Sequence, residues 1–164
     1  RRYDRPCSAV YQDFHNDLYE ELTALYDKLK RYEALHVVFN DRFQFIPNEL
    51  LSGIHQFHGE TQYPITIERD FNVKNLRKGH CYMAISERDL AIILKEMHRR
   101  SWEPHEDIGL LSFDDTPLKE VLAGGITTIS TDFARMGETA AQLITQGKTR
   151  RIANPWVLHD RGSL

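Results

Sequence analysis

Two neighbouring carboxylates, Asp114 and Asp115, directly follow the apolar run at residues 108–113. A continuous apolar run that stops at turn-forming residues is typical of a strand buried on both faces of a sheet. Open α/β sheets bind their ligands in a crevice outside the carboxyl ends of such strands. The two acids therefore predict a ligand site at this end of the strand, with carboxylate oxygens as hydrogen-bond acceptors.

A second polar group, residues 86–89, follows the apolar run at 81–85. The carboxyl ends of parallel strands share one edge of a sheet, so we expect Glu87, Arg88 and Asp89 to lie on the same edge as Asp114. Polar groups that converge on one rim are typical of a binding site. Glu87 and Asp89 are equally suited to capping the helix that follows, and the pattern leaves both roles open.

A third acid, Asp13, stands between a short β-prone run at residues 9–11 and a helical repeat of leucines. Asn16 or Asp17 can cap this helix, because their side chains accept hydrogen bonds from the first free backbone N–H groups. Asp13 and His15 also resemble the metal-binding start of metallophosphoesterases, since both side chains suit a divalent metal. The other motifs of that site, Gly-Asp-x-x-Asp and Gly-Asn-His, do not occur in the sequence, so we expect no metal.

The elements that position these residues alternate between strand and helix. Apolar or β-branched stretches predict strands at residues 35–39, 64–67, 81–85, 108–113, 126–133 and 152–158. Apolar residues at helical spacing predict helices over residues 18–29, 47–57, 90–97 and 133–146. This β-α-β-α-β order with short connections predicts an α/β fold, with a parallel sheet, right-handed crossovers and flanking helices.

Composition excludes several classes of protein. The 164 residues are 41% hydrophobic and 27% charged, as in an ordinary globular protein, and the net charge of −3 gives no electrostatic footprint for nucleic acid. No apolar run approaches the roughly 20 residues that span a bilayer, so we expect no membrane partner. Cys7 and Cys81 match no metal or redox spacing. The chain opens on Arg1 without a signal peptide or an initiator Met, which we interpret as a fragment of a longer protein.

The acidic pair belongs to a longer pattern that resembles the effector-binding domain of LacI-type transcriptional regulators. The family carries a strand ending in Gly-Tyr/Phe-Asp-Asp, a "Leu-Thr-Thr-Ile" segment and a helix opening near a glycine. The matching residues here are Phe113-Asp114-Asp115, then 126–129, Met136-Gly137 and the tail with Arg161 and Ser163. The sequence of residues 125–133 looks closest to that of GntR-type regulators with a LacI-like effector domain. The resemblance is strong over residues 104–144, fair over 3–60 and weak between them.

This resemblance implies a periplasmic-binding-protein-like fold of type I, truncated to the second lobe and part of the first. Residues 1–33, which begin with a family-like Asp4-Arg5-Pro6, would be the end of the first lobe and a crossover helix. Residues 34–125 would form the second lobe, 126–151 the return to the first lobe, and 152–164 the closing strand of the second lobe. The DNA-binding head would be absent from this chain.

The resemblance also assigns roles to site residues. The effector would be bound by Asp114, by Asp13 at a strand end, and by Glu87-Arg88 or Arg88-Asp89 where the family has Asn-Asp. The family usually has an arginine three residues before the glycine of the first helix of this lobe, and Leu50 stands there, before Gly53. Leucine cannot clamp hydroxyls or an anion as a guanidinium does. Either Arg88 supplies that contact, or the effector differs from the family's usual sugars and purines.

The resemblance favours the effector-binding and dimerisation part of a cytoplasmic bacterial regulator. Its partners would be a small effector (a sugar or sugar derivative), operator DNA through the missing head, and a second copy in a homodimer. The alternative is a solute-binding protein of a transport system with the same fold. An enzyme is the least favoured class, because the sequence shows no nucleophile–base pair, no phosphate-binding glycine loop and no cofactor motif.

Overall fold

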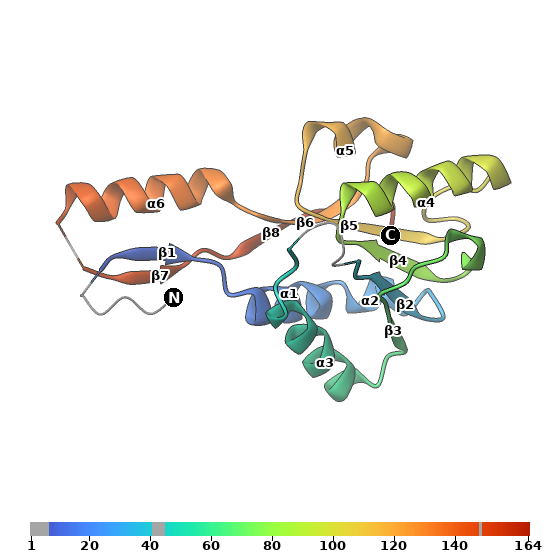
Figure 1. The fold of residues 1–164 in the computed structure, drawn as a ribbon, viewed down its shortest axis with the longest axis horizontal. Coiled ribbons are helices and arrows are strands. Elements are labelled where there is room, and N and C mark those ends of the chain that lie inside the picture. Colours follow the sequence, from blue (N-terminus) through green and yellow to red (C-terminus); the bar gives the residue numbers. More distant parts are fainter. Residues whose placement is uncertain (1–6, 41–44, 148) are drawn as a thin grey trace.

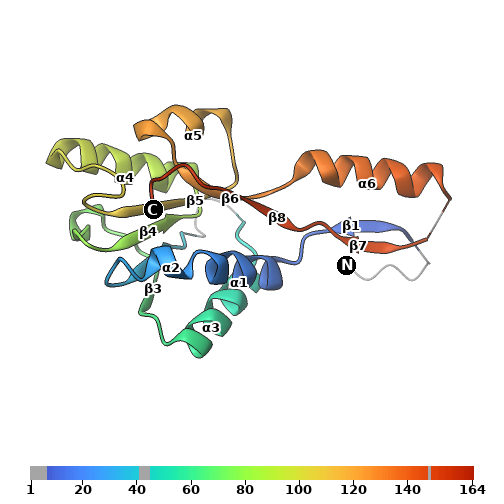
Figure 2. The ribbon, with the colours of Figure 1, turned by 180° about the vertical axis from the view of Figure 1, so that it is seen from behind.

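Two sheets of unequal size divide the chain into a larger and a smaller unit. The computed structural model describes residues 7–40, 45–147 and 149–164. Among these residues, six strands and five helices build the larger unit, while two short strands and one helix build the smaller unit, which extends away from it (Figures 1 and 2). Within the described ranges, no helix is both long and apolar enough to cross a membrane.

The larger sheet has the strand order β3-β2-β4-β5-β6-β8. Neighbouring strands are parallel except for β8, which runs antiparallel to β6. The strands are β2 (Leu35–Val38), β3 (Ile65–Glu68), β4 (Cys81–Ala84), β5 (Gly109–Phe113), β6 (Thr127–Thr131) and β8 (Trp156–His159). Every residue of β4, β5 and β6 is buried, which explains the uninterrupted apolar runs of β4 and β5.

Helices cover both faces of this sheet (Figure 1). On one face lie α1 (Phe14–Ala24), α2 (Tyr26–Leu29) and α3 (Glu49–Thr61), and on the other lie α4 (Glu87–Arg100) and α5 (Pro117–Val121). Two short 3-10 turns, at Val73–Asn75 and Leu122–Gly124, complete the connections. The buried apolar side chains accordingly form two clusters, one under α1 and α3 and one under α4. The α/β fold with a mostly parallel sheet flanked by helices is confirmed.

The start of α1 differs from the prediction. Asp13, and not Asn16 or Asp17, is the N-cap residue, and its carboxylate accepts hydrogen bonds from the backbone N and the side-chain amide of Asn16. Asp17 lies inside the first turn, where its Oδ2 accepts a hydrogen bond from the backbone N of Asp13 at 3.0 Å. Any of these three residue types can cap a helix, so the pattern alone did not decide which one does.

The smaller unit is built from segments far apart in the sequence. Strand β1 (Ala9–Tyr11) pairs in parallel with β7 (Arg151–Ala153), and α6 (Phe133–Thr145) lies beside them. The boundary expected at residue 126 falls later, because β6 belongs to the larger sheet and α6 begins after Asp132, its cap. The expected closing strand is likewise divided between β7 in the smaller sheet and β8 in the larger one. The Asp4-Arg5-Pro6 segment lies outside the described residues.

Three segments connect the two units, and hydrogen bonds join them to one another. The side-chain amide of Gln12 donates to Thr131 Oγ1. The backbone N of Asn154 donates to the carbonyl of Tyr11 at 2.8 Å, and its side-chain amide donates to the carbonyl of Asp132 at 3.1 Å. The connections β1–α1, β6–α6 and β7–β8 are therefore held side by side.

Candidate functional site

A cavity of about 320 Å³ opens at the carboxyl edge of the larger sheet. Strand ends and helix starts converge here because β4 leads into α4 and β5 leads into α5. The described residues that line the cavity are Phe45, Ile46, Pro47, Leu50, Ile85, Glu87, Phe113, Asp114 and Thr116. Apolar walls around a few polar groups are typical of a small-molecule site.

Asp114 is the half-buried carboxylate of this cavity. Its backbone has a φ of 57°, a left-handed conformation that Asp tolerates better than most residues and that turns the chain sharply at the end of β5. Burial raises the pKa of its carboxyl above the ordinary value, with a smaller opposing effect from Lys119. No described residue donates a hydrogen bond to its carboxylate, so a ligand with hydroxyl or amine donors would satisfy it.

Asp115, the adjacent acid, is fully engaged within the protein. Arg161 donates to both of its carboxylate oxygens, at 2.7 and 2.9 Å, and Thr128 Oγ1 donates to one of them at 2.7 Å. These hydrogen bonds lower the pKa of Asp115 to about 2. The two neighbouring acids therefore have different tasks: Asp115 fixes the tail of the chain to β6, and Asp114 faces the cavity.

The tail residues noted in the sequence have a similar structural task. Ser163 Oγ donates to the carbonyl of Leu110 at 2.6 Å and accepts a hydrogen bond from the backbone N of Thr127 at 2.8 Å. Ser163 thus bridges β5 and the start of β6 from a buried position.

The polar residues at the start of α4 divide into two roles. Ser86 is the N-cap, and its Oγ accepts from the backbone N of Asp89 at 3.0 Å and donates to Asp89 Oδ2 at 2.6 Å. Asp89 is 3% exposed and is committed to this cap, as the capping alternative predicts. Glu87 lines the cavity, whereas Arg88 is exposed on the first helical turn and is not among the lining residues.

Asp13 does not line the cavity within the described part of the chain. It lies where β1 passes into α1, and its carboxylate is occupied by Asn16. The neighbouring Asp17 is 8% exposed, and burial raises the pKa of its carboxyl to about 6. The structure therefore places these acids at a connection between the units.

Sequence reasoning missed several residues of the site. Phe45 and Phe113 contribute aromatic surface, and Thr116 contributes a buried hydroxyl without a partner among the described residues. Lys119 is 2% exposed, and its ammonium donates to the carbonyls of Phe113 and Asp114 at 2.7 and 2.6 Å. A lysine on a short helix gives no sign in the sequence that it returns to stabilise the end of the preceding strand.

A second polar cluster lies in the larger sheet, away from the residues of the cavity. His36 Nδ1 lies 3.0 Å from Glu68 Oε1, His36 Nε2 lies 2.9 Å from His80 Nδ1, and His80 Nε2 lies 3.3 Å from Glu33 Oε2. These groups satisfy one another, and the described residues contain no group of three or more side chains arranged to hold a metal ion. The cavity beside Asp114 is therefore the better candidate site.

Comparisons with known proteins support the fold. A family described as "Periplasmic binding protein-like domain" matches residues 53–162. No curated protein matches the sequence. Among solved structures, a periplasmic binding ribose operon repressor protein from Lactobacillus acidophilus superposes with a TM-score of 0.75 at 16% identity, covering 98% of this chain and 66% of that chain. The lac repressor dimer bound to operator and the anti-inducer ONPF superposes with a TM-score of 0.73 at 15% identity, covering 98% and 62%.

A third structure, a complex of the transcriptional regulator CelR with cellobiose, superposes with a TM-score of 0.68 at 14% identity, covering 99% of this chain and 55% of that chain. At these identities the likeness concerns the fold. The chain spans less than two thirds of the length of each of these three proteins.

Proposed function

Because the chain belongs to the periplasmic-binding-protein-like domain family, we propose that it is the effector-binding and dimerisation part of a DNA-binding transcriptional regulator. The effector is a small sugar or sugar derivative. The observation that carries the proposal is the cavity at the carboxyl edge of the larger sheet, where the carboxylate of Asp114, without a hydrogen-bond donor among the described residues, lies among apolar walls. Structural relatives named as a ribose operon repressor, the lac repressor and a cellobiose-bound regulator support it.

The chemistry of the cavity suits a neutral sugar. A sugar ring has hydroxyl donors at its rim and C–H groups on its faces, so it needs acceptors at one side and apolar surface at another. Asp114 and the hydroxyl of Thr116, which has no partner among the described residues, provide polar contacts. Phe113 and the 89% exposed ring of Phe45 provide apolar surface. Leu50, which is fully buried beside the cavity, cannot bind an acidic ligand as an arginine guanidinium would.

The hydrogen-bonded connections between the two units offer a route from binding to response. The described residues that line the cavity belong to the larger unit. A ligand bound there that also contacts the smaller unit favours the arrangement in which the two units approach each other, and it acts only through its different affinity for the two arrangements. In the proposal this change reaches operator DNA through a DNA-binding part outside this chain, in a cytoplasmic homodimer. The proposal gives the chain no catalytic role.

The experiment that tests the proposal is a calorimetric titration with neutral sugars, including ribose, maltose and cellobiose. At least one sugar is expected to bind, and Asp114→Asn is expected to weaken binding by about tenfold, because one charge-assisted hydrogen bond is lost. Asp27→Asn is the matched control, since Asp27 is an exposed acid of α2 paired with Lys30 and does not line the cavity.

Binding that Asp114→Asn leaves unchanged would place the effector elsewhere in the fold. Absence of binding by every neutral sugar, with tight binding of a cationic or anionic metabolite, would overturn the sugar assignment. Thermal unfolding of each variant, followed by circular dichroism, separates lost binding from lost folding.

A further inference from the structure

Two histidines and two glutamates form a continuous series of contacts at the edge of the larger sheet. The series runs from Glu68 at the end of β3 to His36 of β2, then to His80 before β4, and ends at Glu33 before β2. The side chains of His36 and His80 are only 14% and 12% exposed. Their ring nitrogens therefore depend on one another and on the glutamates for hydrogen bonds. We call these four residues the histidine cluster.

The three contacts of the cluster require a definite number of protons on the four ring nitrogens. His36 Nδ1 and His80 Nε2 each need an N–H group, because the ionised carboxylates that they face only accept hydrogen bonds. The contact between the two rings needs an N–H group on one ring and a bare nitrogen on the other. Three N–H groups are one more than two neutral imidazoles carry. The full set of contacts therefore belongs to a pair of histidines that shares one positive charge.

A second added proton breaks this set of contacts. Every ring nitrogen then carries a hydrogen, so two N–H groups face each other where His36 Nε2 and His80 Nδ1 lie 2.9 Å apart. Two positive charges also meet there, and like charges at this distance disfavour the doubly protonated form. The two rings must separate when both are protonated.

The surrounding groups decide when the second proton is taken up. The titratable side chains that face the two rings are Glu68 of β3, Glu33 before β2, Arg77 in the connection to β4, and Tyr82 of β4, whose ring stacks on His36. The glutamates attract the shared positive charge, and Arg77 opposes it. Burial raises the pKa of the Tyr82 phenol, so Tyr82 is uncharged near neutral pH.

The direction of the pH effect follows from His80. Burial, and then the neighbouring His36, lower the pKa of His80 below its ordinary value of 6.5. An unfolded chain therefore binds this proton more readily than the folded chain does. The contribution of the cluster to stability is present above about pH 6.5 and is lost as the pH falls through the lower folded value.

The cluster connects the edge of the sheet to its centre. Strand β3 is an edge strand, and β2 is its partner among the described strands. The contact of His36 with Glu68 joins β2 to β3, and the contact of His36 with His80 joins β2 to the start of β4. Residues 69–80, which connect β3 to β4, end in the cluster at His80. Separation of the two rings therefore loosens β3 and this connection.

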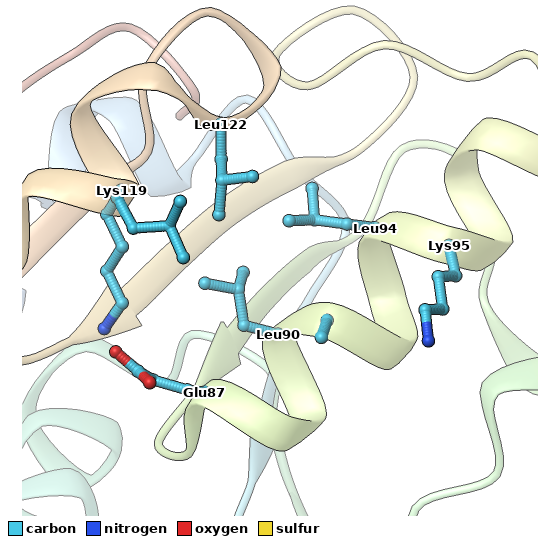
Figure 3. A pocket seen from close by; sticks show the side chains of 8 residues that line it. Glu87, Leu90, Leu94, Lys95, Lys119 and Leu122 are labelled. Carbon is cyan, nitrogen blue, oxygen red and sulfur yellow. The ribbon is translucent and has the colours of Figure 1, made fainter.

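We propose that the histidine cluster is a pH-sensitive switch at the edge of the larger sheet: it is closed when the two histidines share one positive charge, and acid opens it by adding a second. None of its four residues lines the cavity beside Asp114 or the apolar groove between α4 and α5, where Figure 3 shows Leu90, Leu94 and Leu122. The inference therefore does not depend on the proposed effector.

The first test is amide hydrogen exchange at pH 7 and pH 5, measured by mass spectrometry with exchange times matched to the intrinsic rates at each pH. Peptides that cover residues 65–80 are expected to lose protection by about tenfold at pH 5, because the hydrogen bond between the rings is lost. Peptides that cover β5, at the centre of the sheet, are expected to keep their protection and serve as the internal reference.

The second test removes one ring at a time. His36→Gln and His80→Gln are each expected to reduce the pH effect on residues 65–80 to less than about twofold. The amide of Gln offers both an N–H group and a carbonyl oxygen, so it can bond to either form of the remaining ring. His55→Gln is the matched control, because His55 is an exposed histidine of α3 outside the cluster, and it is expected to leave the pH effect unchanged.

The third test follows the ring resonances of the histidines by NMR during a pH titration. In His36→Gln, the pKa of His80 is expected to rise, with a proton affinity about tenfold higher, because the neighbouring positive charge is removed. In the unsubstituted chain, the resonances of both rings are expected to move in each of two steps, since the protons belong to the pair.

Equal protection of residues 65–80 at pH 5 and pH 7 would overturn the inference, as would a pH effect that His36→Gln and His80→Gln leave unchanged. A single independent step for each histidine in the unsubstituted chain would also overturn it, even if a variant failed to fold. Sugar binding is measured at the cavity, so these outcomes leave the proposed effector function as it stands.

Discussion

The larger and the smaller unit differ in how completely they bury their apolar side chains. In the larger unit, Leu35, Phe57 and Leu111 are fully buried in a core that extends from α1 and α3 to the sheet. In the smaller unit, Leu143 is the buried residue of α6, while Phe133 and Ile144 on the same helix are 61% and 80% exposed. Burial of apolar surface dominates the free energy of folding, so the larger unit carries most of the stability of this chain.

The largest effect is expected from matched truncations in the two units. Phe57→Ala removes a fully buried ring that packs against Tyr26, with 5.6 Å between ring centroids, and should lower the free energy of unfolding by about 3–5 kcal/mol. Ile144→Ala should change it by less than about 0.5 kcal/mol, because the side chain is mostly in solvent. Urea titration followed by circular dichroism measures both. Equal losses would contradict the unequal division of stability.

A smaller effect is expected at the ion pair between Arg161 and Asp115 in the larger unit. Arg161→Met leaves the half-buried Asp115 without its main partner and should lower the free energy of unfolding by about 2 kcal/mol at neutral pH. The folded pKa of Asp115, about 2, lies below its ordinary value of 3.8, so its contribution is present above pH 4 and is lost as the pH falls toward 2. Urea titrations between pH 2 and pH 7 should show the variant losing less stability with acid than the unsubstituted chain. If the variant and the unsubstituted chain differed by the same free energy of unfolding at every pH, Arg161 would stabilise the fold through packing and not through its charge.

The smallest effect is expected where α1 leaves the connection between the units. Burial raises the folded pKa of Asp17 to about 6, above its ordinary 3.8, so ionisation between pH 4 and pH 6 costs stability. Asp17→Asn retains an oxygen for the backbone N of Asp13 and should gain about 1 kcal/mol above pH 6 and nothing below pH 4. Thermal unfolding at pH 4 and pH 7 measures the difference. A gain at pH 4 would show that charge is not its cause.

The central strands of the larger sheet could be predicted from the sequence, because they are continuous apolar runs. Residues 81–85 and 108–113 contain β4 and β5. The strand predicted at residues 126–133 is present as Thr127–Thr131, but it was assigned to the return to the first lobe. It is instead a fully buried strand of the larger sheet, and its hydroxyl groups find partners such as Asp115. Local pattern does not reveal such partners, because they come from distant parts of the chain.

The residues that line the candidate cavity were predicted in part for the same reason. Asp114 and Glu87 line the cavity at the end of the sheet where strand order placed them. Asp89 differs from Glu87 by two positions in one helical turn, and its hydrogen bonds with Ser86, not its residue type, decide its role. Asp115 differs from Asp114 because Arg161, 46 residues later, reaches it. Phe45 and Thr116 lack any sequence feature that separates them from ordinary loop residues.

The three hydrogen-bonded connections between the units also set the mechanics of the molecule. A single linker would let the smaller unit swing and rotate in any direction. Three neighbouring segments, joined through Gln12, Thr131 and Asn154, act as a hinge that allows bending and resists twisting or sliding of one unit against the other. Relative motion of the two units is thereby reduced toward one rotational degree of freedom.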